Sequence, residues 1–393
     1  MFYIVDFQLS NFVHISIFPY LYIVLTIEDM RVKQADLSIP YITEHAEELW
    51  LRLRYPDGKP RCPYCGQQTK QYLCKGGRYK CNHCNHRYSS RVGTAFHNTN
   101  LTPAQIMLSL YLILSQPAIS CQTLVRQVGI SYKAGWSLQK RVQVATEQTE
   151  VLTGVVAVDE VYLGGKWKYI HYQRKLQILR RLGLIGEDDH RFTPSQALQG
   201  IDRYKHPVFG GNDGQRIFLI QMPTGFDKEC IVEAYQEHTK EVEICVSDDS
   251  SLYADWKDRH EVNNHSKHKY RSEEGHSSNP IEGTFGHYQT AFRCGYVHCD
   301  EKYVQLYLNL FVFKWNNRNN SFYTMLANMI GCITRKRCRY KDIRAYDGLQ
   351  KYKIRAQEKE NKRREFAAKI LNGNSMAASV TIDNHTYTRQ MLT

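Results

Sequence analysis

Two Cys-x-x-Cys pairs in the first quarter of the chain restrict most strongly what that region can fold into. Cys62 and Cys65 form one pair, and fifteen residues separate it from the second pair, Cys81 and Cys84. At this spacing two tight turns can each present two thiolates to one tetrahedral zinc ion. We therefore expect a zinc ribbon over residues 61–95, holding a structural Zn²⁺ because four protein ligands leave no open position for water. The alternative is four unrelated free thiols.

The charge balance of the chain favours a polyanionic partner. It has 393 residues, with 52 Lys and Arg against 39 Asp and Glu, for a net charge of +13. This makes nucleic acid the leading candidate, although basic ribosome-associated and membrane-surface proteins share the composition. The 12 cysteines are unevenly spread. Together with the two close pairs, this spread indicates metal binding in a reducing compartment rather than a disulfide framework.

A hydrophobic stretch near the start does not look like a membrane segment. It covers residues 12–27 and contains His14 and Pro19, so it is shorter than the roughly 20 apolar residues needed to span a bilayer. No basic region precedes it and no small-residue cleavage site follows it, which argues against a signal peptide. We expect no membrane association, and we predict that translation begins at Met30 and that residues 1–30 are an extension.

The region after the ribbon is expected to be a small all-α domain over residues 100–150. Within it, residues 120–142 place Leu124, Val125 and Val128 on one face, followed by a turn at Gly129. A second helix opens at Ser131, with Trp136 and Leu138 predicted to point inward. This pattern is typical of a DNA-binding helix-turn-helix, and equally of an ordinary helical hairpin. The side chains expected to face a DNA groove or its phosphates are Ser131, Tyr132, Lys133, Gln139, Lys140 and Arg141.

From residue 153 the pattern changes to β-branched alternation. Strands are expected at residues 154–162, 216–222 and 241–246, with a helix at 227–239 between the last two, which predicts a mixed α/β domain. A basic, polar stretch at residues 166–206 is interpreted as an insertion or mobile loop. The predicted divisions are an N-terminal extension (1–30), an N-terminal helix (31–60), the zinc ribbon (61–95), the helix-turn-helix domain (100–150), the α/β domain (153–320) and a basic helical tail (321–393).

Acidic residues emerge from two of the predicted strands. Asp159 and Glu160 end the first apolar strand, and Asp248 follows the last one. If the two strands pair side by side, Asp159 and Asp248 meet, and two adjacent carboxylates favour an intervening cation such as Mg²⁺. The alternative is a pair of solvated aspartates at strand ends.

A third acidic element opens a helix at Asn279-Pro280-Ile281-Glu282. The apolar stripe of this helix is Ile281, Phe285, Tyr288 and Phe292. Pro280 suits a first helical position, so Asn279 can be the N-cap and Glu282 its partner three residues on. That capping role needs no chemistry. The alternative is that Glu282 binds metal.

Several of these motifs together resemble one enzyme family. The order is zinc ribbon, helix-turn-helix, Val-Asp-Glu-x-Tyr-x-Gly-Gly-Lys, Ser-Asp-Asp with Tyr253 five residues on, Val-Asn-Asn-His-Ser at 262–266, Asn-Pro-Ile-Glu-Gly, and Phe-Lys-Trp-Asn-Asn-Arg at 313–318. It is similar to the ISXO-type insertion-sequence transposases over residues 36–320. The resemblance implies an RNase H-like catalytic domain with two aspartates and a third residue, which is asparagine or glutamate. The corresponding residues here are Asp159, Asp248 and either Asn279 or Glu282. The family tends to have a lysine seven residues after the glutamate, where this chain has Gln289.

The resemblance also implies partners and cofactors. Two Mg²⁺ or Mn²⁺ ions, held by Asp159, Asp248 and Glu282, are expected to serve cleavage and joining of DNA strands. The expected partners are double-stranded DNA, both element ends and target, and a second copy or more of the chain. Lys166 is expected to contact DNA. His265 and His276 are candidates for groups just behind the metal ligands, and the alternative, which is the commoner case, is that they are exposed loop histidines. The expected location is cytoplasmic and nucleoid-associated in a prokaryote, or nuclear in a eukaryotic host.

Two other functions fit the same residues. One is a catalytically inactive, transposase-derived DNA-binding regulator, which Gln289 would suit. The other is an RNase H-like nuclease that cleaves branched DNA or RNA hybrids without joining. Cleavage and strand transfer on the element's ends distinguish the three.

Overall fold

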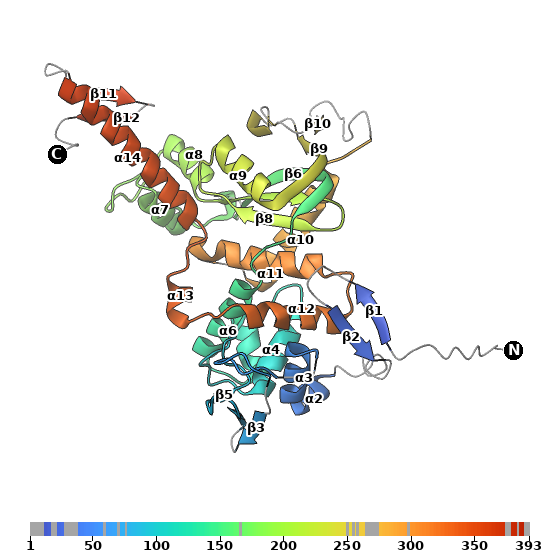
Figure 1. The fold of residues 1–393 in the computed structure, drawn as a ribbon. Coiled ribbons are helices and arrows are strands. Elements are labelled where there is room, and N and C mark those ends of the chain that lie inside the picture. Colours follow the sequence, from blue (N-terminus) through green and yellow to red (C-terminus); the bar gives the residue numbers. More distant parts are fainter. Residues whose placement is uncertain are drawn as a thin grey trace.

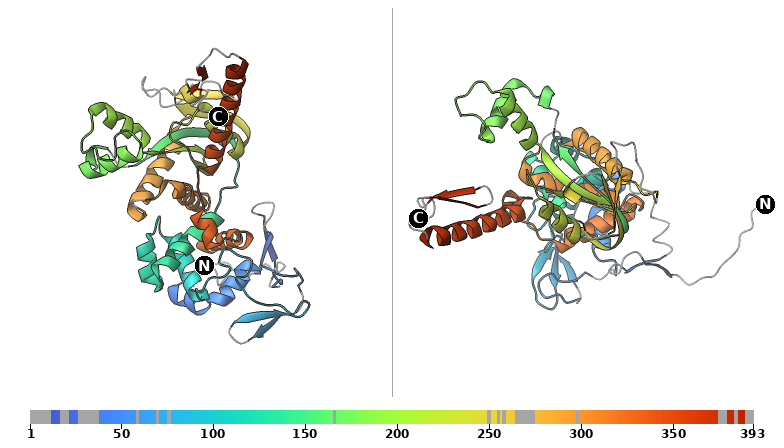
Figure 2. Two further views of the ribbon diagram at one scale, coloured as in Figure 1. Left: turned by 90° about the vertical axis from the view of Figure 1, so that its left-hand side faces the viewer. Right: turned by 90° about the horizontal axis from the view of Figure 1, so that it is seen from above.

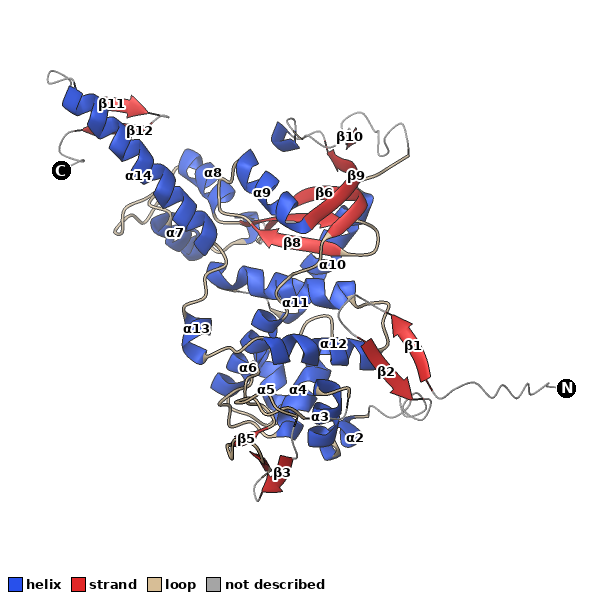
Figure 3. Cartoon of the chain, in the orientation of Figure 1, coloured by secondary structure: helices blue, strands red, loops and turns tan. Residues whose placement is uncertain are grey.

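The computed structural model describes residues 12–16, 22–26, 38–57, 60–68, 71–74, 77–164, 167–248, 251–253, 256, 259–263, 275–296, 299–373, 379–382 and 385–388. Lys166 and His265, both named above as expected site residues, lie outside these ranges. Figure 1 shows a helical unit with a small ribbon at one end of the molecule and a larger sheet at the other. In the cartoon of Figure 3 the strands of the ribbon and of the sheet are separated by helices. No helix of the described part is long and apolar enough to cross a membrane.

The N-terminal elements form two small sheets and two helices. The antiparallel pair is β1 (Phe12–Ser16) and β2 (Tyr22–Thr26). Where one helix was expected there are two, α2 (Ile39–Glu44) and α3 (Ala46–Arg54). The ribbon sheet follows, with strands β3 (Gln71–Cys74), β4 (Arg78–Cys81) and β5 (Arg87–Ser89). The Arg54 guanidinium on α3 donates to the carbonyl oxygens of Ser90 and Val92, which ties the ribbon to the helices.

Side-chain caps define the next three helices, α4 (Pro103–Ser115), α5 (Cys121–Val128) and α6 (Tyr132–Ala145). Thr102 and Gln105 form a capping box on α4, which begins at Pro103. Ser120 and Ser131 cap the other two. Gly129 ends α5 with φ of 71°, a left-handed conformation that suits glycine. The predicted pair of helices joined at Gly129 is therefore present.

The large sheet has five strands in the order β10-β9-β6-β7-β8. Their bounds are β6 (Leu152–Leu163), β7 (His206–Asn212), β8 (Ile217–Gln221), β9 (Thr239–Asp248) and β10 (His260–Asn263). Strands β6, β7 and β8 are antiparallel neighbours, whereas β9 is parallel to β6 and β10 parallel to β9. This confirms the expected mixed α/β domain.

Helices cover both faces of this sheet because side chains alternate along each strand. Val156 and Val158 of β6 pack with α9 (Lys228–His238) and with Tyr253 of the 3₁₀ turn η2 (Ser251–Tyr253). Ala157 and Val161 face the opposite side. There they pack with α10 (Asn279–Gly295) and α11 (Val304–Asn316), which follows the short turn η4 (Glu301–Tyr303). The predicted α10 stripe is buried accordingly, with Phe292 only partly so.

Side-chain amides close the open edge of β8. Asn316 pairs with both backbone groups of Ile217, and Gln148 pairs with both of Leu219. Gln305 accepts from the N–H of Gln221 and donates to the carbonyl of Leu219. These amides stand in for a sixth strand at alternate residues, so the edge is not available for strand addition.

The stretch between β6 and β7 is helical, so of the two expected alternatives the insertion fits and the loop does not. It contains the short turn η1 (Trp167–Tyr169), α7 (Tyr172–Arg181) and α8 (Pro194–Arg203). Leu176, Leu179 and Ile185 form a small core of its own. Figure 2 shows these helices, in green, projecting from the sheet. The segment contains many charged residues, but its apolar residues recur at the spacing of one helix face, which predicts an amphipathic helix.

The chain after residue 320 is not one basic tail. Helix α12 (Phe322–Arg335) and the short α13 (Tyr340–Arg344) pack into the core of the N-terminal helical unit. Only the longer α14 (Gln350–Gly373) projects from the body, beside the hairpin of β11 (Ser379–Ile382) and β12 (His385–Thr388). The helical unit is therefore built from two distant parts of the sequence.

Candidate active site and zinc site

The four predicted zinc ligands meet at one point. Among the described residues, Cys62, Cys65, Cys81 and Cys84 are the set whose ligand atoms all lie within 4.8 Å of one another. The Sγ atoms of Cys62 and Cys84 are 3.5 Å apart, and those of Cys65 and Cys81 are 3.8 Å apart. Zn–S bonds of about 2.3 Å in a tetrahedron require sulfur atoms separated by about 3.8 Å. The four cysteines therefore fit a structural zinc ion.

Two matching turns position these thiolates. The N–H of Gly66 donates to the Cys62 carbonyl, and the N–H of Asn85 donates to the Cys81 carbonyl. Gly66 and Asn85 both have positive φ, of 71° and 59°, which glycine and asparagine adopt most readily. Each Cys-x-x-Cys pair thus ends in the same left-handed turn. Cys74, which lies between the two pairs in sequence, is outside the four-sulfur group.

The strand pairing brings the two aspartates to the same edge of the large sheet. Ala157 of β6 lies opposite Val246 of β9 in the parallel pair, so Asp159 and Asp248 follow at the same level. Both point to the face covered by α10, because their alternate neighbours Ala157 and Val246 pack there. Each side chain is half-buried.

Helix α10 approaches this edge closely and brings Glu282 to it. Gly210 of β7 lies opposite Asp159, and a Cβ at Gly210 would be 3.0 Å from Ile281 and 2.7 Å from Leu219. Only a glycine allows the helix to pack this near the sheet. The exposed Glu282 carboxylate accepts a hydrogen bond of 2.9 Å from the Ser278 hydroxyl.

The carboxylates influence one another. Burial, with the charges of Glu160, Asp248 and Glu282, raises the pKa of Asp159 to about 7, although a hydrogen bond from the Glu160 N–H opposes the rise. The three carboxylates of Asp159, Asp248 and Glu282 do not meet the 4.8 Å spacing of the cysteine set. Two-metal sites hold cations about 3.5–4 Å apart, so their ligands need not share a single coordination sphere.

The neighbouring Glu160 faces the other side of the sheet. Its carboxylate accepts a hydrogen bond from the hydroxyl of Tyr253, whose side chain is fully buried. Tyr253, singled out in the sequence by its place in a motif, therefore orients Glu160 among the apolar residues under α9. The alternation along β6 separates the roles of these adjacent acids.

The start of α10 differs from the prediction by one residue. Ser278, not Asn279, is the N-cap, and Asn279 is the exposed first residue of the helix. The predicted capping pair of Asn279 and Glu282 is therefore wrong. Proline fits the second helical position because N–H groups of the first turn have no partner within the helix. His276, just before the helix, contacts Glu261 of β10, with Nδ1 2.9 Å from Oε2.

Three of the predicted DNA contacts are buried instead. The side chains of Gln139, Lys140 and Arg141 are 2%, 0% and 5% exposed, because α11, α12 and α13 cover the later turns of α6. Arg141 donates to the carbonyls of Ala95 and Cys338. Lys140 and Arg141 are therefore structural, and the first turn of α6 with Ser131, Tyr132 and Lys133 is what stays exposed.

Lys140 joins the helical unit to the sheet domain. Its Nζ lies 3.6 Å from the ring centre of Tyr307 and 5.0 Å from that of Tyr303, and it donates to Gln143 over 2.9 Å. Burial lowers the pKa of Lys140 to about 7, whereas the two ring faces favour the charged amine.

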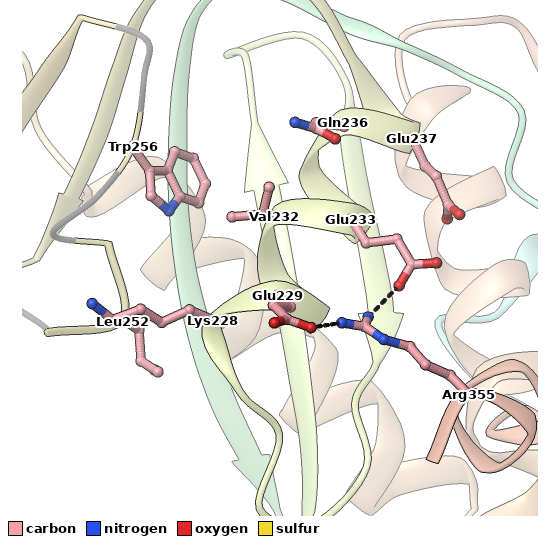
Figure 4. A pocket seen from close by; sticks show the side chains of 9 residues that line it. All are labelled: Lys228, Glu229, Val232, Glu233, Gln236, Glu237, Leu252, Trp256 and Arg355. Carbon is pink, nitrogen blue, oxygen red and sulfur yellow. Dashed lines mark hydrogen bonds and ion pairs between the residues drawn. The ribbon is translucent and has the colours of Figure 1, made fainter. Parts of the chain in front are cut away.

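A pocket of about 630 Å³ lies on the other face of the sheet, next to α9. Trp256, Leu252 and Val232 line one side of it, and Arg355 of α14 reaches Glu229 and Glu233 across the other (Figure 4). It does not include the half-buried carboxylates.

Comparison with known families finds two matching domains. Residues 151–316 match the ISXO2-like transposase domain, and residues 43–87 match the transposase zinc-ribbon domain. These matches together cover more than half of the chain. No curated protein matches it. The first match spans the strands and the helix that carry Asp159, Asp248 and Glu282, and the second contains all four cysteines. The chain therefore belongs to the ISXO2-like family of insertion-sequence transposases, with a transposase zinc ribbon ahead of its α/β domain.

Proposed function

We propose that the protein binds the terminal inverted repeats of its insertion sequence and catalyses metal-dependent cleavage and transfer of DNA strands. The observation that carries this proposal is the convergence of Asp159, Asp248 and Glu282 on one edge of the sheet. The order of the five strands, with two parallel pairings (β10 with β9, β9 with β6) and two antiparallel ones (β6 with β7, β7 with β8), supports an RNase H-like assignment of the domain.

The residues at the edge fit divalent cations. Carboxylate oxygens are the ligands that Mg²⁺ and Mn²⁺ prefer. Burial, and after it the charges of Glu160, Asp248 and Glu282, raise the pKa of Asp159, and a cation bound beside it would favour the ionised carboxylate. Asp159 and Asp248 would hold two ions, with Glu282 in preference to Asn279 as the third ligand, because the charge of Glu282 acts on Asp159. Bound there, the ions would supply Lewis-acid activation of a water and neutralise charge on the phosphate. Ser278 orients Glu282 through its hydrogen bond.

The exposed surface of the two-helix pair suits DNA. In a helix-turn-helix the first residues of the second helix contact base edges. Ser131, Tyr132 and Lys133 occupy that position and are exposed. The exposed Gln122 and Arg126 of α5 would contact the backbone. Because two ends must be paired before joining, we propose that a homodimer or larger assembly acts on DNA.

The direct test is a strand-cleavage and joining assay on oligonucleotides that carry the element's ends, with Mn²⁺ or Mg²⁺. Asp159→Ala and Asp248→Ala should abolish both reactions and leave end binding unchanged. Glu160→Gln is the matched control, because it alters the adjacent acid on the opposite face and keeps a group that accepts from Tyr253. Cleavage that survives Asp159→Ala would refute the proposed mechanism.

A DNA-binding regulator without catalysis remains the second candidate because of Gln289. That position on α10 lacks the family's lysine, and Gln289 instead accepts a hydrogen bond of 3.2 Å from the exposed Arg293.

For the catalytic function, in contrast, we propose that Arg293 supplies the positive charge in place of that lysine, one turn further along the helix. End binding without any cleavage, in the same assay, would favour the regulator.

A further inference from the structure

Asn263, the last residue of β10, is buried in an unusual way. Its side chain is 0% exposed, and neither Nδ2 nor Oδ1 has a hydrogen-bond partner within the described ranges. Folded proteins keep few buried amides in this condition, because an amide removed from water without a partner destabilises the fold. Such a group calls for a partner other than the residues that the structure describes.

The strand register places this amide beside the carboxylates. Asn263 lies directly opposite Asp248 in the parallel pair of β10 and β9. Asp248 is in turn level with Asp159, two residues beyond the pairing of Ala157 with Val246. Directly opposed residues on neighbouring strands point to the same face of a sheet. Asn263, Asp248 and Asp159 therefore form one row across the carboxyl ends of three parallel strands, on the face to which α10 brings Glu282.

The other polar residue of β10 on this face is already engaged. Glu261, two residues before Asn263, lies 2.9 Å from His276 and 4.0 Å from Arg259. Its contacts lead away from the row, so Asn263 is the group on β10 that stands level with the aspartates. An amide also suits this place electrostatically. A further carboxylate would add to the repulsion that Asp159 already experiences, whereas an amide oxygen is a neutral ligand for a hard cation.

We propose that Asn263 belongs to the divalent-cation site of Asp159, Asp248 and Glu282, where its amide oxygen is an additional, uncharged ligand, direct or through one water. This inference rests on the proposed metal-dependent function. It assigns a role to the Val-Asn-Asn-His-Ser motif, of which Asn263 is the second residue.

The test measures Mn²⁺ binding and thermal unfolding of the full-length protein, independently of DNA cleavage. Asn263→Leu keeps the size of the side chain and removes its polar atoms. Without metal its melting temperature should equal that of the wild type or exceed it by about 2–4 °C, because a buried unpaired amide is removed. Its Mn²⁺ affinity, followed by the electron paramagnetic resonance signal of free Mn²⁺, should fall about 10-fold or more.

Three further variants make the result decisive. Asn263→Asp retains an oxygen ligand and should bind Mn²⁺ within about threefold of the wild type or more tightly. Val262→Ala alters the same strand on its exposed face and should leave the affinity unchanged. Asp159→Ala should abolish the binding. If Asn263→Leu binds Mn²⁺ with an affinity within twofold of the wild type, the inference about Asn263 alone is overturned. If the wild type binds no Mn²⁺, or if Asp159→Ala leaves its Mn²⁺ binding unchanged, the proposed function is overturned as well.

Discussion

At the scale of single residues, the alternation of side chains along β6 places two adjacent acids on opposite faces of the sheet. Asp159 faces α10 and the other carboxylates, while Glu160 faces α9 and accepts from Tyr253. The sequence shows both acids leaving an apolar strand, but not which face is which, because that depends on the helices that later cover the sheet. Burial and neighbouring acids then give Asp159 a pKa of about 7. Its protonation is therefore set by the fold and by any bound cation.

This pKa predicts how metal binding depends on pH. A cation must displace the proton of Asp159, so Mn²⁺ affinity should fall about 10-fold per pH unit below pH 7 and level off above it. Titration calorimetry in two buffers of different ionisation enthalpy should detect about one proton released near pH 6.5. An affinity that is flat between pH 5.5 and 7.5 would contradict the assignment.

The same pKa predicts that, without metal, the free energy of unfolding decreases as the pH rises, whereas Mn²⁺ affinity increases. The unfolded carboxyl titrates near pH 3.9, so between about pH 4 and 7 the folded state binds more protons than the unfolded state. The contribution of Asp159 to the free energy of unfolding is therefore present below pH 4 and is lost as the pH rises to about 7. Asp159→Asn should remove this part of the pH dependence, which denaturant titrations can measure.

At the scale of elements, the approach of α10 to the sheet depends on a missing side chain. Gly210 lies beneath Ile281 and Phe285, where a methyl group would be 3.0 and 3.1 Å from them. The sequence shows the apolar stripe of α10 and predicts its burial. It gives no sign of which strand glycine makes room for that stripe, because this contact joins residues about 70 positions apart.

Gly210→Ala should therefore move α10 and Glu282 away from Asp159. We expect strand cleavage to fall at least 10-fold, with a smaller loss of stability, since overpacking typically costs about 1–3 kcal/mol. Gly286→Ala is the control, because a Cβ there meets nothing within 4 Å. Cleavage rates for the purified variants decide the matter, and equal rates for both would show that the close packing of α10 is not needed.

At the scale of the whole molecule, α11 joins the two halves. Leu310 and Phe313 belong to the core of the helical unit, whereas Leu308 and Val312 belong to the core under the sheet. The Phe-Lys-Trp-Asn-Asn-Arg motif at 313–318 is this joint. Lys314 donates to the Gln116 carbonyl, and Asn316 pairs with Ile217 of β8.

The domains themselves could be predicted from local patterns, but their assembly could not. Cysteine spacing, helix caps and strand alternation are short-range signals, and they identify the ribbon, the helix pair and the α/β domain. The return of α12 to cover α6 depends on contacts nearly 200 residues apart, such as that of Arg141 with Cys338. For this reason Lys140 and Arg141 looked exposed in the sequence and are buried in the fold.

Helix α14 is attached by two different kinds of contact. Leu349 and Tyr352 at its base are buried with α9. Beyond them, basic residues of α14 meet a matching row of acids on α9, in the ion pairs Lys351–Glu237, Arg355–Glu233, Arg355–Glu229 and Lys359–Glu229. Exposed pairs of this kind contribute about 0.2–1 kcal/mol each and weaken with salt. These basic residues of α14 are thus paired within the chain.

Glu233→Lys should release the outer part of α14 and leave its base in place. Hydrogen exchange should accelerate in residues 355–373, with little change in the melting temperature of the whole protein. Non-specific DNA affinity should rise, because the basic face becomes accessible. The exposed Glu243 of β9, replaced by Lys, makes the same charge change away from α14, and similar exchange in both variants would refute this account of the attachment.

The central claim is that Asp159, Asp248 and Glu282, distant in sequence, hold divalent cations at one edge of the sheet. The most direct measurement is anomalous diffraction from crystals of the protein grown with Mn²⁺. The account predicts anomalous density between Asp159 and Asp248, within about 2.0–2.3 Å of their carboxylate oxygens, and its disappearance in Asp159→Ala crystals. Well-ordered carboxylates with no anomalous density between them at saturating Mn²⁺ would contradict it.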